Sequence, residues 1–444
     1  MLRSTIRRAQ GGSCRRKLGS SVLGVGAVSA LVAGVALLGV PGAVASGRSS
    51  PYTTLSVAVG GESDGVAVDD TTGNVYVASG ASTVSVIDEA TDTVTATIPV
   101  GPDPQGVGVD ASTGTVYVAS GASNTVSVID EATDTVTATI PVGIDPNGIA
   151  VDPSTGTVYV ANTGNNASGG SVSVIDEATD SVTATIPVGD APIGVGVDPS
   201  TGTVYVASDD TNTVSVIDGT TDTVTATIPV GDAPDGVGVD PSTGTVWVAN
   251  TGYVGSDTNT VSVIDEATGT VVATPTVGIR PWGVGVDPST GTVYVTNFGA
   301  STVSVIDEAT DSVTATIPVG INPLGVGVDP STGTAYVSSS SSDTVSVIVP
   351  ATVKVSPTSG RPGASVSVSG QGFNPGETVK ITYKTGLASP VSVTICSATA
   401  GSNSSFSCTG RIPPAATAGA HGVHTVAAKG RTSLIKVKTT FTLT

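Results

Sequence analysis

The sequence predicts an all-β protein, and three observations lead to that prediction. A unit of about 42 residues recurs seven times between Gly65 and Val349. Each copy contains four short runs in which Val, Thr, Ile and Tyr follow the two-residue period of a β-strand. Beyond the first 45 residues, no stretch of helical length has a 3.6-residue period. A fixed repeat of this size is typical of arrays whose units bury their apolar faces against their neighbours.

The unit is clearest between Gly194 and Asp235. Its four runs are GVGVD, TVYVA, TVSVID and TVTATIPV. The turn sequence DPSTGT follows the first run, a variable Ser/Gly/Asn/Asp stretch follows the second, and EATDT or a close variant of it follows the third. Four short antiparallel strands match one blade of a β-propeller, and seven units lie within the usual range of about four to eight blades.

The two ends of the array predict closure into a ring. The seventh unit stops after its third run at Thr344–Val349, and the missing fourth run is supplied at the front by Thr53–Gly60. An N-terminal strand that completes the last blade leaves no open edge. Proline recurs in the fourth run, which predicts that this strand is the outer edge, where a missing backbone donor costs little. These prolines are Pro99, Pro141, Pro187, Pro229 and Pro318.

One copy carries a recognisable motif. Val286–Asn297 has the sequence VDPSTGTVYVTN, and Val303–Gly320 has the sequence VSVIDEATDSVTATIPVG. These segments resemble the YVTN family of β-propeller repeats, and the similarity extends from Tyr52 to Val349. The resemblance implies a secreted or cell-surface protein of the kind found in bacteria and archaea. It also implies a fold shared with lactonase-like and streptogramin-lyase-like enzymes, although the repeat itself carries no defined activity.

A second kind of sequence begins at Ala351. Val353–Tyr383 has short strand-like runs broken by Pro/Gly turns, and it is similar to the start of IPT/TIG-type and related bacterial immunoglobulin-like domains. About 90 residues with six or seven short strands predict a small β-sandwich. Such modules usually act as spacers or adhesion units.

The first 45 residues are interpreted as a signal peptide. A basic segment is followed by an apolar stretch from about Val22 to Val40 and by the small-residue sequence AVA before Ser46. An uncleaved anchor is the alternative, and export by the general or the twin-arginine route stays open. The predicted organisation is a signal peptide at 1–45, a propeller at 46–350 and an immunoglobulin-like module at 351–444. We expect a secreted or cell-surface monomer without a membrane span after cleavage.

The two cysteines beyond the signal segment are Cys396 and Cys408, which flank a turn between two strand-like runs. In an oxidising compartment they predict a disulfide that staples a hairpin. Two free buried thiols are the alternative.

Charge divides the chain sharply. Residues 51–350 hold 35 of the 36 acidic residues and one basic residue, Arg280, whereas residues 351–444 hold nine Lys/Arg and one acid, Glu377. A propeller this acidic argues against nucleic acid as a partner. Most acids occupy repeated turn positions, where a carboxylate can accept backbone hydrogen bonds. The basic module either contacts anionic wall polymers or balances the charge of the propeller.

A search for catalytic groups favours binding over chemistry. The predicted propeller has no histidine and no cysteine, which excludes Ser-His-Asp and Cys-His arrangements inside it. His421 and His424 lie in the small module and are expected to be surface residues. The sequence offers acids but no base near neutral pKa.

Variation between the units is concentrated in two loops, the one before the first strand and the one after the second. In a propeller both lie on the same face, so a ligand site is placed there, with drift in exposed loops as the alternative. Arg280 and Trp282 are its predicted centre. The predicted acidic rim consists of Asp103, Asp145, Asp190, Asp232 and Asp235. Such a rim suits a saccharide, a peptide or a bridging Ca²⁺; no other metal or cofactor is expected.

Together these features predict a non-catalytic binding or structural protein that acts at or beyond the cell surface, on a wall polysaccharide or a protein. The alternative is a lactonase-like propeller enzyme that uses carboxylates and a metal on the same face. A third possibility is that the array is only a rigid spacer.

Overall fold

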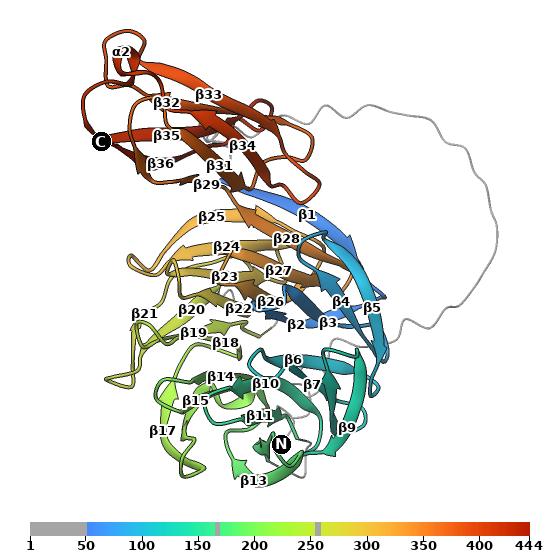
Figure 1. Cartoon of the computed structure of the whole chain (residues 1–444). Coiled ribbons are helices and arrows are strands. Elements are labelled where there is room, and N and C mark those ends of the chain that lie inside the picture. Colours follow the sequence, from blue (N-terminus) through green and yellow to red (C-terminus); the bar gives the residue numbers. More distant parts are fainter. Residues whose placement is uncertain (1–50, 165–168, 254–258) are drawn as a thin grey trace, which may run out of the picture. The chain divides into compact units, whose positions relative to one another are not determined.

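The computed structural model describes residues 51–164, 169–253 and 259–444, which are almost entirely β-structure (Figure 1). The predicted signal segment at 1–45 and parts of the two loop insertions lie outside the described residues. Within the described ranges the helical elements are η1 (Asp209–Thr211) and α2 (Ala415–Ala418). None of the described helices has the length and apolar character needed to cross a membrane.

The described residues from Tyr52 to Pro350 form seven four-stranded antiparallel sheets. The first strands are β2 (Ser63–Asp69), β6 (Pro104–Asp110), β10 (Pro146–Asp152), β14 (Pro192–Asp198), β18 (Pro234–Asp240), β22 (Pro281–Asp287) and β26 (Pro323–Asp329). The second strands are β3 (Asn74–Ser79), β7 (Thr115–Ser120), β11 (Thr157–Asn162), β15 (Thr203–Ser208), β19 (Thr245–Asn250), β23 (Thr292–Asn297) and β27 (Thr334–Ser339).

The third and fourth strands complete each sheet in chain order. The third strands are β4 (Thr83–Asp88), β8 (Thr125–Asp130), β12 (Ser171–Asp176), β16 (Thr213–Asp218), β20 (Thr260–Asp265), β24 (Thr302–Asp307) and β28 (Thr344–Pro350). The fourth strands are β5 (Thr93–Pro99), β9 (Thr135–Pro141), β13 (Ser181–Pro187), β17 (Thr223–Pro229), β21 (Thr270–Ala273), β25 (Ser312–Pro318) and β1 (Tyr52–Ala58).

The N-terminal strand β1 completes the last sheet, as the sequence predicts. It pairs with β28 from Tyr52 opposite Pro350 to Ala58 opposite Thr344. The predicted position of the fourth-strand prolines is also confirmed, because five of these strands end in proline at the outer edge of their sheet.

The apolar core lies between successive sheets rather than within one sheet. In one cluster, Tyr117 and Ile140 of one sheet pack with Val158 and Ile175 of the next. The second and third strands are buried along most of their length, whereas the fourth strands are mostly exposed. Each unit therefore depends on its neighbours for burial, which is the physical basis of a repeat array.

The first strands meet at the inner edge of the array through glycine. A Cβ added to Gly65 would lie 2.4 Å from the carbonyl oxygen of Gln105 in the next sheet, and one added to Gly325 would lie 2.5 Å from that of Asp64. Side chains are excluded by this backbone-to-backbone packing. First strands contact one another in chain order, and β26 contacts β2. The array therefore closes on itself in the manner of a β-propeller.

Residues 351–444 form two further sheets around one shared core. The three-stranded sheet contains β29 (Thr352–Ser356), β31 (Ser365–Gln371) and β34 (Phe406–Arg411). The five-stranded sheet contains β30 (Ser359–Gly360), β36 (Lys436–Leu443), β35 (Gly422–Gly430), β32 (Thr378–Lys384) and β33 (Ser392–Thr399).

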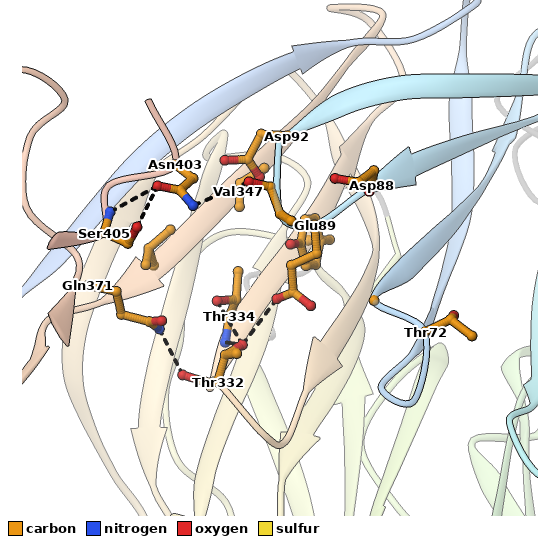
Figure 2. Close-up of a pocket in the computed structure, with 14 residues that line it drawn as sticks. Thr72, Asp88, Glu89, Asp92, Thr332, Thr334, Val347, Gln371, Asn403 and Ser405 are labelled. Carbon is orange, nitrogen blue, oxygen red and sulfur yellow. Dashed lines mark hydrogen bonds between the residues drawn. The ribbon is translucent and has the colours of Figure 1, made fainter. Parts of the chain in front are cut away.

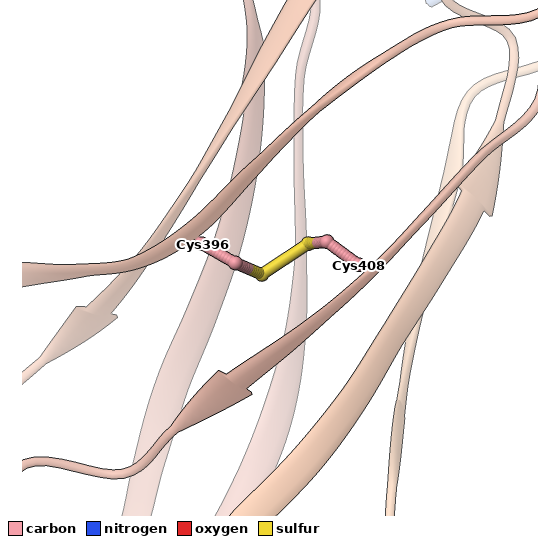
Figure 3. The surroundings of a disulfide bond; sticks show 2 residues. All are labelled: Cys396 and Cys408. Atoms are coloured by element: carbon pink, nitrogen blue, oxygen red, sulfur yellow. A yellow bond between two sulfur atoms is a disulfide. The ribbon is translucent and has the colours of Figure 1, made fainter.

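The predicted disulfide between Cys396 and Cys408 is present, with a Cα–Cα distance of 6.2 Å (Figure 3). The prediction that it staples a hairpin is wrong. Cys396 lies on β33, which pairs with β32, whereas Cys408 lies on β34, which pairs with β31. The bond joins the two sheets because the chain crosses from one sheet to the other in the intervening turn.

Candidate functional site

The two variable loops of each unit are hydrogen-bonded to one another. The backbone N–H of Thr251, after β19, donates to the carbonyl of Ala233 at 3.0 Å, and that of Phe298, after β23, donates to Arg280 at 2.9 Å. The same pairing occurs in other units, for example from Thr163 to Asp145. The structure therefore places both variable loops at the same end of each sheet.

A β-bulge aims one variable residue inward in every unit. In β18 the pairing with β19 shifts between Pro234 and Val237, which leaves Asp235 and Gly236 outside the regular ladder. Bulges re-aim side chains in this way and are common near functional sites. The glycine packs against the next sheet, so the residue before it stands at the inner rim. These rim residues are Asp64, Gln105, Asn147, Ile193, Asp235, Trp282 and Leu324.

The two variable loops of one unit bring a cation and two aromatic rings together. The guanidinium carbon of Arg280 lies 5.0 Å from the centre of the Phe298 ring. The ring centres of Trp282 and Phe298 are 5.7 Å apart. Arg280 and Trp282 are both half-buried, so the cation–π contact is partly shielded from water and stronger than at an exposed surface. The φ angle of Arg280 is 53°, a left-handed turn conformation that Asp103 and Asp145 share at equivalent positions.

A buried carboxyl lies beside this aromatic pair. Asp235 is 3% exposed, and the hydroxyl of Thr251 contacts both its Oδ2 and the carbonyl oxygen of Pro281. A hydroxyl carries a single proton, so it makes one full hydrogen bond as a donor. A protonated Asp235 satisfies both contacts, since its own proton then goes to Thr251 and that of Thr251 goes to Pro281.

Electrostatics favour the same protonated state. Burial raises the pKa of Asp235 to about 8, with repulsion from Asp209 adding to the rise and the hydrogen bond from Thr251 and the charge of Arg280 opposing it. Burial and the neighbouring Asp210 also raise the pKa of Asp209 to about 6. The expectation that no acid–base group has a pKa near neutrality is therefore wrong, because sequence does not reveal which aspartate is buried.

The seven predicted site residues are distributed over several places. Asp235, Arg280 and Trp282 come together as described. The carboxylates of Asp103 and Asp145 converge on Gly121, where an added Cβ would lie 2.9 Å from Asp145 Oδ1 and 3.4 Å from Asp103 Oδ2.

The two remaining members of the predicted rim lie elsewhere in the variable loops. Asp190 is exposed beside Gly169, and the carbonyl of Asp232 accepts from the N–H of Gly252. Within the described ranges, no group of three or more His, Cys, Asp or Glu side chains is arranged to hold a metal ion.

Three members of the cluster, Asp209, Thr251 and Phe298, were not predicted. Each is the first residue after the second strand of its unit. That position varies as strongly as the inner rim, since it is occupied by Gly80, Gly121, Thr163, Asp209, Thr251, Phe298 and Ser340. Pairing this position with the rim position before the glycine, instead of treating the two loops separately, would have identified Asp209, Thr251 and Phe298 from the sequence.

The repeated turn acids have a structural role, as expected. Asp152 accepts from the backbone N–H and the hydroxyl of Ser154 at 2.9 and 2.6 Å. Glutamates of the turn after the third strand accept hydrogen bonds from a neighbouring unit. For example, the hydroxyl of Thr72 donates to Glu131 at 2.6 Å. These contacts tie neighbouring sheets together.

A cavity of about 280 Å³ is lined by residues of β27, by the β4–β5 turn and by Gln371, Asn403 and Ser405 (Figure 2). Thr332 donates from its hydroxyl to Glu89 at 3.1 Å, and its carbonyl accepts from the amide of Gln371 at 2.9 Å. Burial, repulsion from Asp329 and a hydrogen bond with that residue raise the pKa of Glu89 to about 7. Glu89 in this cavity is thus one of the turn glutamates that hydrogen-bond to a neighbouring sheet.

Comparisons with known proteins support the fold and nothing further. No protein-family model and no curated protein matches the chain. Among solved structures, the chain is similar to the hydrazine synthase of Kuenenia stuttgartiensis, with 21% identity and a TM-score of 0.57. The match covers 65% of this chain and 95% of that chain. At this identity the likeness extends only to the propeller-like arrangement of four-stranded sheets.

Proposed function

We propose that the chain is an exported seven-bladed propeller of the YVTN type, followed by an IPT/TIG-like or immunoglobulin-like module, and that it binds a ligand at or beyond the cell surface without transforming it. The observation that carries this proposal is the cluster of Arg280, Trp282, Phe298 and Asp235 at the inner rim. Its residues come from two adjacent units. Arg280, Trp282 and Phe298 have no residue of the same type at the equivalent positions of the other units, whereas Asp235 shares its residue type with Asp64. The strands and regular turns of the units are nearly identical, so the chemical differences between units lie in the variable loops that hold this cluster.

The chemistry of the cluster suggests an extended ligand with an anionic group. Trp282 and Phe298 offer apolar faces for a sugar ring or a side chain. Arg280 presents a fork suited to a carboxylate, and a neutral Asp235 leaves that cation uncompensated. A carboxylate-bearing saccharide or peptide combines these requirements.

The test uses the fluorescence of Trp282. Trp247 is fully buried at a position that tyrosine occupies in the other units, so a Trp247→Tyr background leaves Trp282 as the only tryptophan. Acidic and neutral oligosaccharides and peptides are titrated against this protein and against its Arg280→Gln and Phe298→Ala variants. Binding of an acidic ligand that weakens at least about tenfold in both variants supports the proposal. Equal response in all three proteins contradicts it.

The enzyme alternative has one observation in its favour, the near-neutral pKa of Asp235, which suits a general acid. Lactone hydrolysis by the wild-type chain that is lost in Asp235→Asn would establish the enzyme and displace the binding proposal.

A further inference from the structure

One face of the five-stranded sheet at the C-terminus is lined by lysine. On β32, Val379, Ile381 and Tyr383 are buried in the shared core, so the alternating Lys380, Thr382 and Lys384 point away from it. The same alternation applies to β35 and β36, whose core residues include Val426 and Phe441. The outward lysines of the three strands are all exposed: Lys380, Lys384, Lys429, Lys436 and Lys438. We call these five residues the lysine face.

The strand register sets three of these lysines side by side. Lys380 is directly opposite Lys429, and Lys429 is directly opposite Lys436. Residues opposite each other on one face have Cβ atoms about 4.5–5.5 Å apart, and like charges at that distance destabilise a sheet. The opposed charges of this row, Lys380, Lys429 and Lys436, therefore do not favour folding.

No acid within residues 351–444, all of which the structure describes, neutralises the three lysines Lys380, Lys429 and Lys436. Glu377 is the only acid in residues 351–444, and it is 6% exposed. Its carboxylate accepts hydrogen bonds from the backbone N–H groups of Asn374, Thr432 and Ser433 and from the hydroxyls of the last two. These bonds outweigh the effect of burial and lower its pKa. Glu377 is thus committed to a loop, and the face stays cationic.

We propose that the lysine face binds a linear polymer of phosphodiester-linked polyol units, of the poly(glycerol phosphate) kind. Adjacent strands space the lysine backbones at intervals of about 5 Å, and alternate residues along a strand lie about 7 Å apart, so the flexible lysine side chains can reach successive phosphates of an extended chain. Lysine binds phosphate as a point charge. Thr382, Thr425 and Thr440 add hydroxyl donors on the same face.

The composition of the face also distinguishes among polyanions. Its outward residues on β32, β35 and β36 include no aromatic side chain, and proteins that bind single-stranded nucleic acid stack bases on such side chains. A polymer without bases needs only the charges and hydroxyls that this face supplies. This site is separate from the rim of Arg280 and Trp282, so each proposal can fail alone.

The test measures binding of the full chain to soluble poly(glycerol phosphate) as a function of salt. The row variant is Lys380→Gln/Lys429→Gln/Lys436→Gln. The matched control is Lys354→Gln/Arg361→Gln/Arg411→Gln, which removes the same charge from exposed positions outside the row. We expect the row variant to weaken binding at least about tenfold at low salt and to lower the salt slope by about one per lysine removed. The control should stay within about twofold, and Arg280→Gln should have no effect.

Thermal unfolding of the row variant keeps the test decisive, since removal of opposed charges should leave the midpoint unchanged or raised. Equal loss of binding in the row and control variants would show that bulk charge suffices, and would overturn the proposal. Tighter binding to phosphatidylglycerol vesicles or to single-stranded DNA than to the polymer would overturn it as well, and so would salt-sensitive self-association through the same lysines.

Discussion

Asp235 is the residue whose burial has the clearest measurable consequence. Its folded-state pKa of about 8 lies far above the value of about 4 expected in the unfolded chain. The stability that the neutral carboxyl contributes is therefore complete below pH 4 and is lost as the pH rises toward 8. Asp235→Asn should gain stability relative to the wild type by up to about 1.4 kcal/mol per pH unit within that window. Chemical denaturation at several pH values measures the difference, and a difference that does not vary with pH would contradict the assignment.

The glycine that follows Asp235 supports a second prediction at the same scale. A Cβ at Gly236 would lie 2.4 Å from the carbonyl oxygen of Trp282 in the next sheet, where only backbone could move to relieve the contact. Gly236→Ala should cost at least about 2 kcal/mol of unfolding free energy. Gly60→Ala is the control, because the nearest atom to its added Cβ is 3.9 Å away. Similar costs at both positions would show that the inner edge is not closely packed.

Among the structural elements, the disulfide has the most direct test. Because it closes a short loop between two sheets, it should stabilise the C-terminal sheets by about 3 kcal/mol. The Cys396→Ser/Cys408→Ser variant should unfold these sheets at a lower temperature and leave the transition of the other sheets unchanged. Calorimetry resolves the two transitions, and addition of a reductant to the wild type should reproduce the variant. A shift confined to the larger transition would contradict the prediction.

The strands were more predictable than the contacts between them. Period-two runs such as TVSVID specify a strand by local pattern alone, and the proline of TIPV marks the outer edge. In the unit that contains β21, the proline of the fourth strand is Pro275, one position earlier than in the other units. This earlier proline explains why β21 ends at Ala273. The crossing of the chain between β33 and β34 has no such local signature, because two strands joined by a short turn look alike whether or not they pair. The disulfide was therefore predicted and its setting was not.

Across the whole molecule, the repeat allowed closure to be predicted from its missing strand, but not the chemistry of the rim. Closure is a counting argument, and β1 satisfies it. The site depends on which variable residues a bulge turns inward and which of them are buried. Asp235 and Asp232 are three residues apart in the sequence, yet only Asp235 is buried. Sequence places both in the variable loop, and three-dimensional packing separates their roles.

Paired glutamate and aspartate side chains that lie between neighbouring sheets make the stability of the whole array depend on pH. Burial and nearby aspartates raise the pKa values of Glu89, Glu266 and Glu308, that of Glu89 to about 7. Burial opposes ionisation of the partner Asp329, but hydrogen bonds from Thr332 and Ser331 outweigh it and lower its pKa. A single proton held between the glutamate and the aspartate lets the two carboxyl groups hydrogen-bond to each other, whereas ionisation of both places two negative charges side by side.

The sign of the effect follows from these shifts. Raised glutamate pKa values give stability that is complete below about pH 4.3 and is lost as the pH rises through 7. Lowered aspartate values give stability that is lost only in stronger acid. The unfolding temperature should therefore be higher at pH 5 than at pH 8.

A pair of variants separates the shared proton from bulk charge. In Glu89→Gln the amide replaces the shared proton permanently, so the fall between pH 5 and pH 8 should be smaller than in the wild type. Glu62→Gln removes the same charge at an exposed position and should behave like the wild type. Thermal unfolding across this range measures both, and equal pH profiles in all three proteins would show that repulsion spread over the acidic array, rather than the paired carboxyls, sets the response.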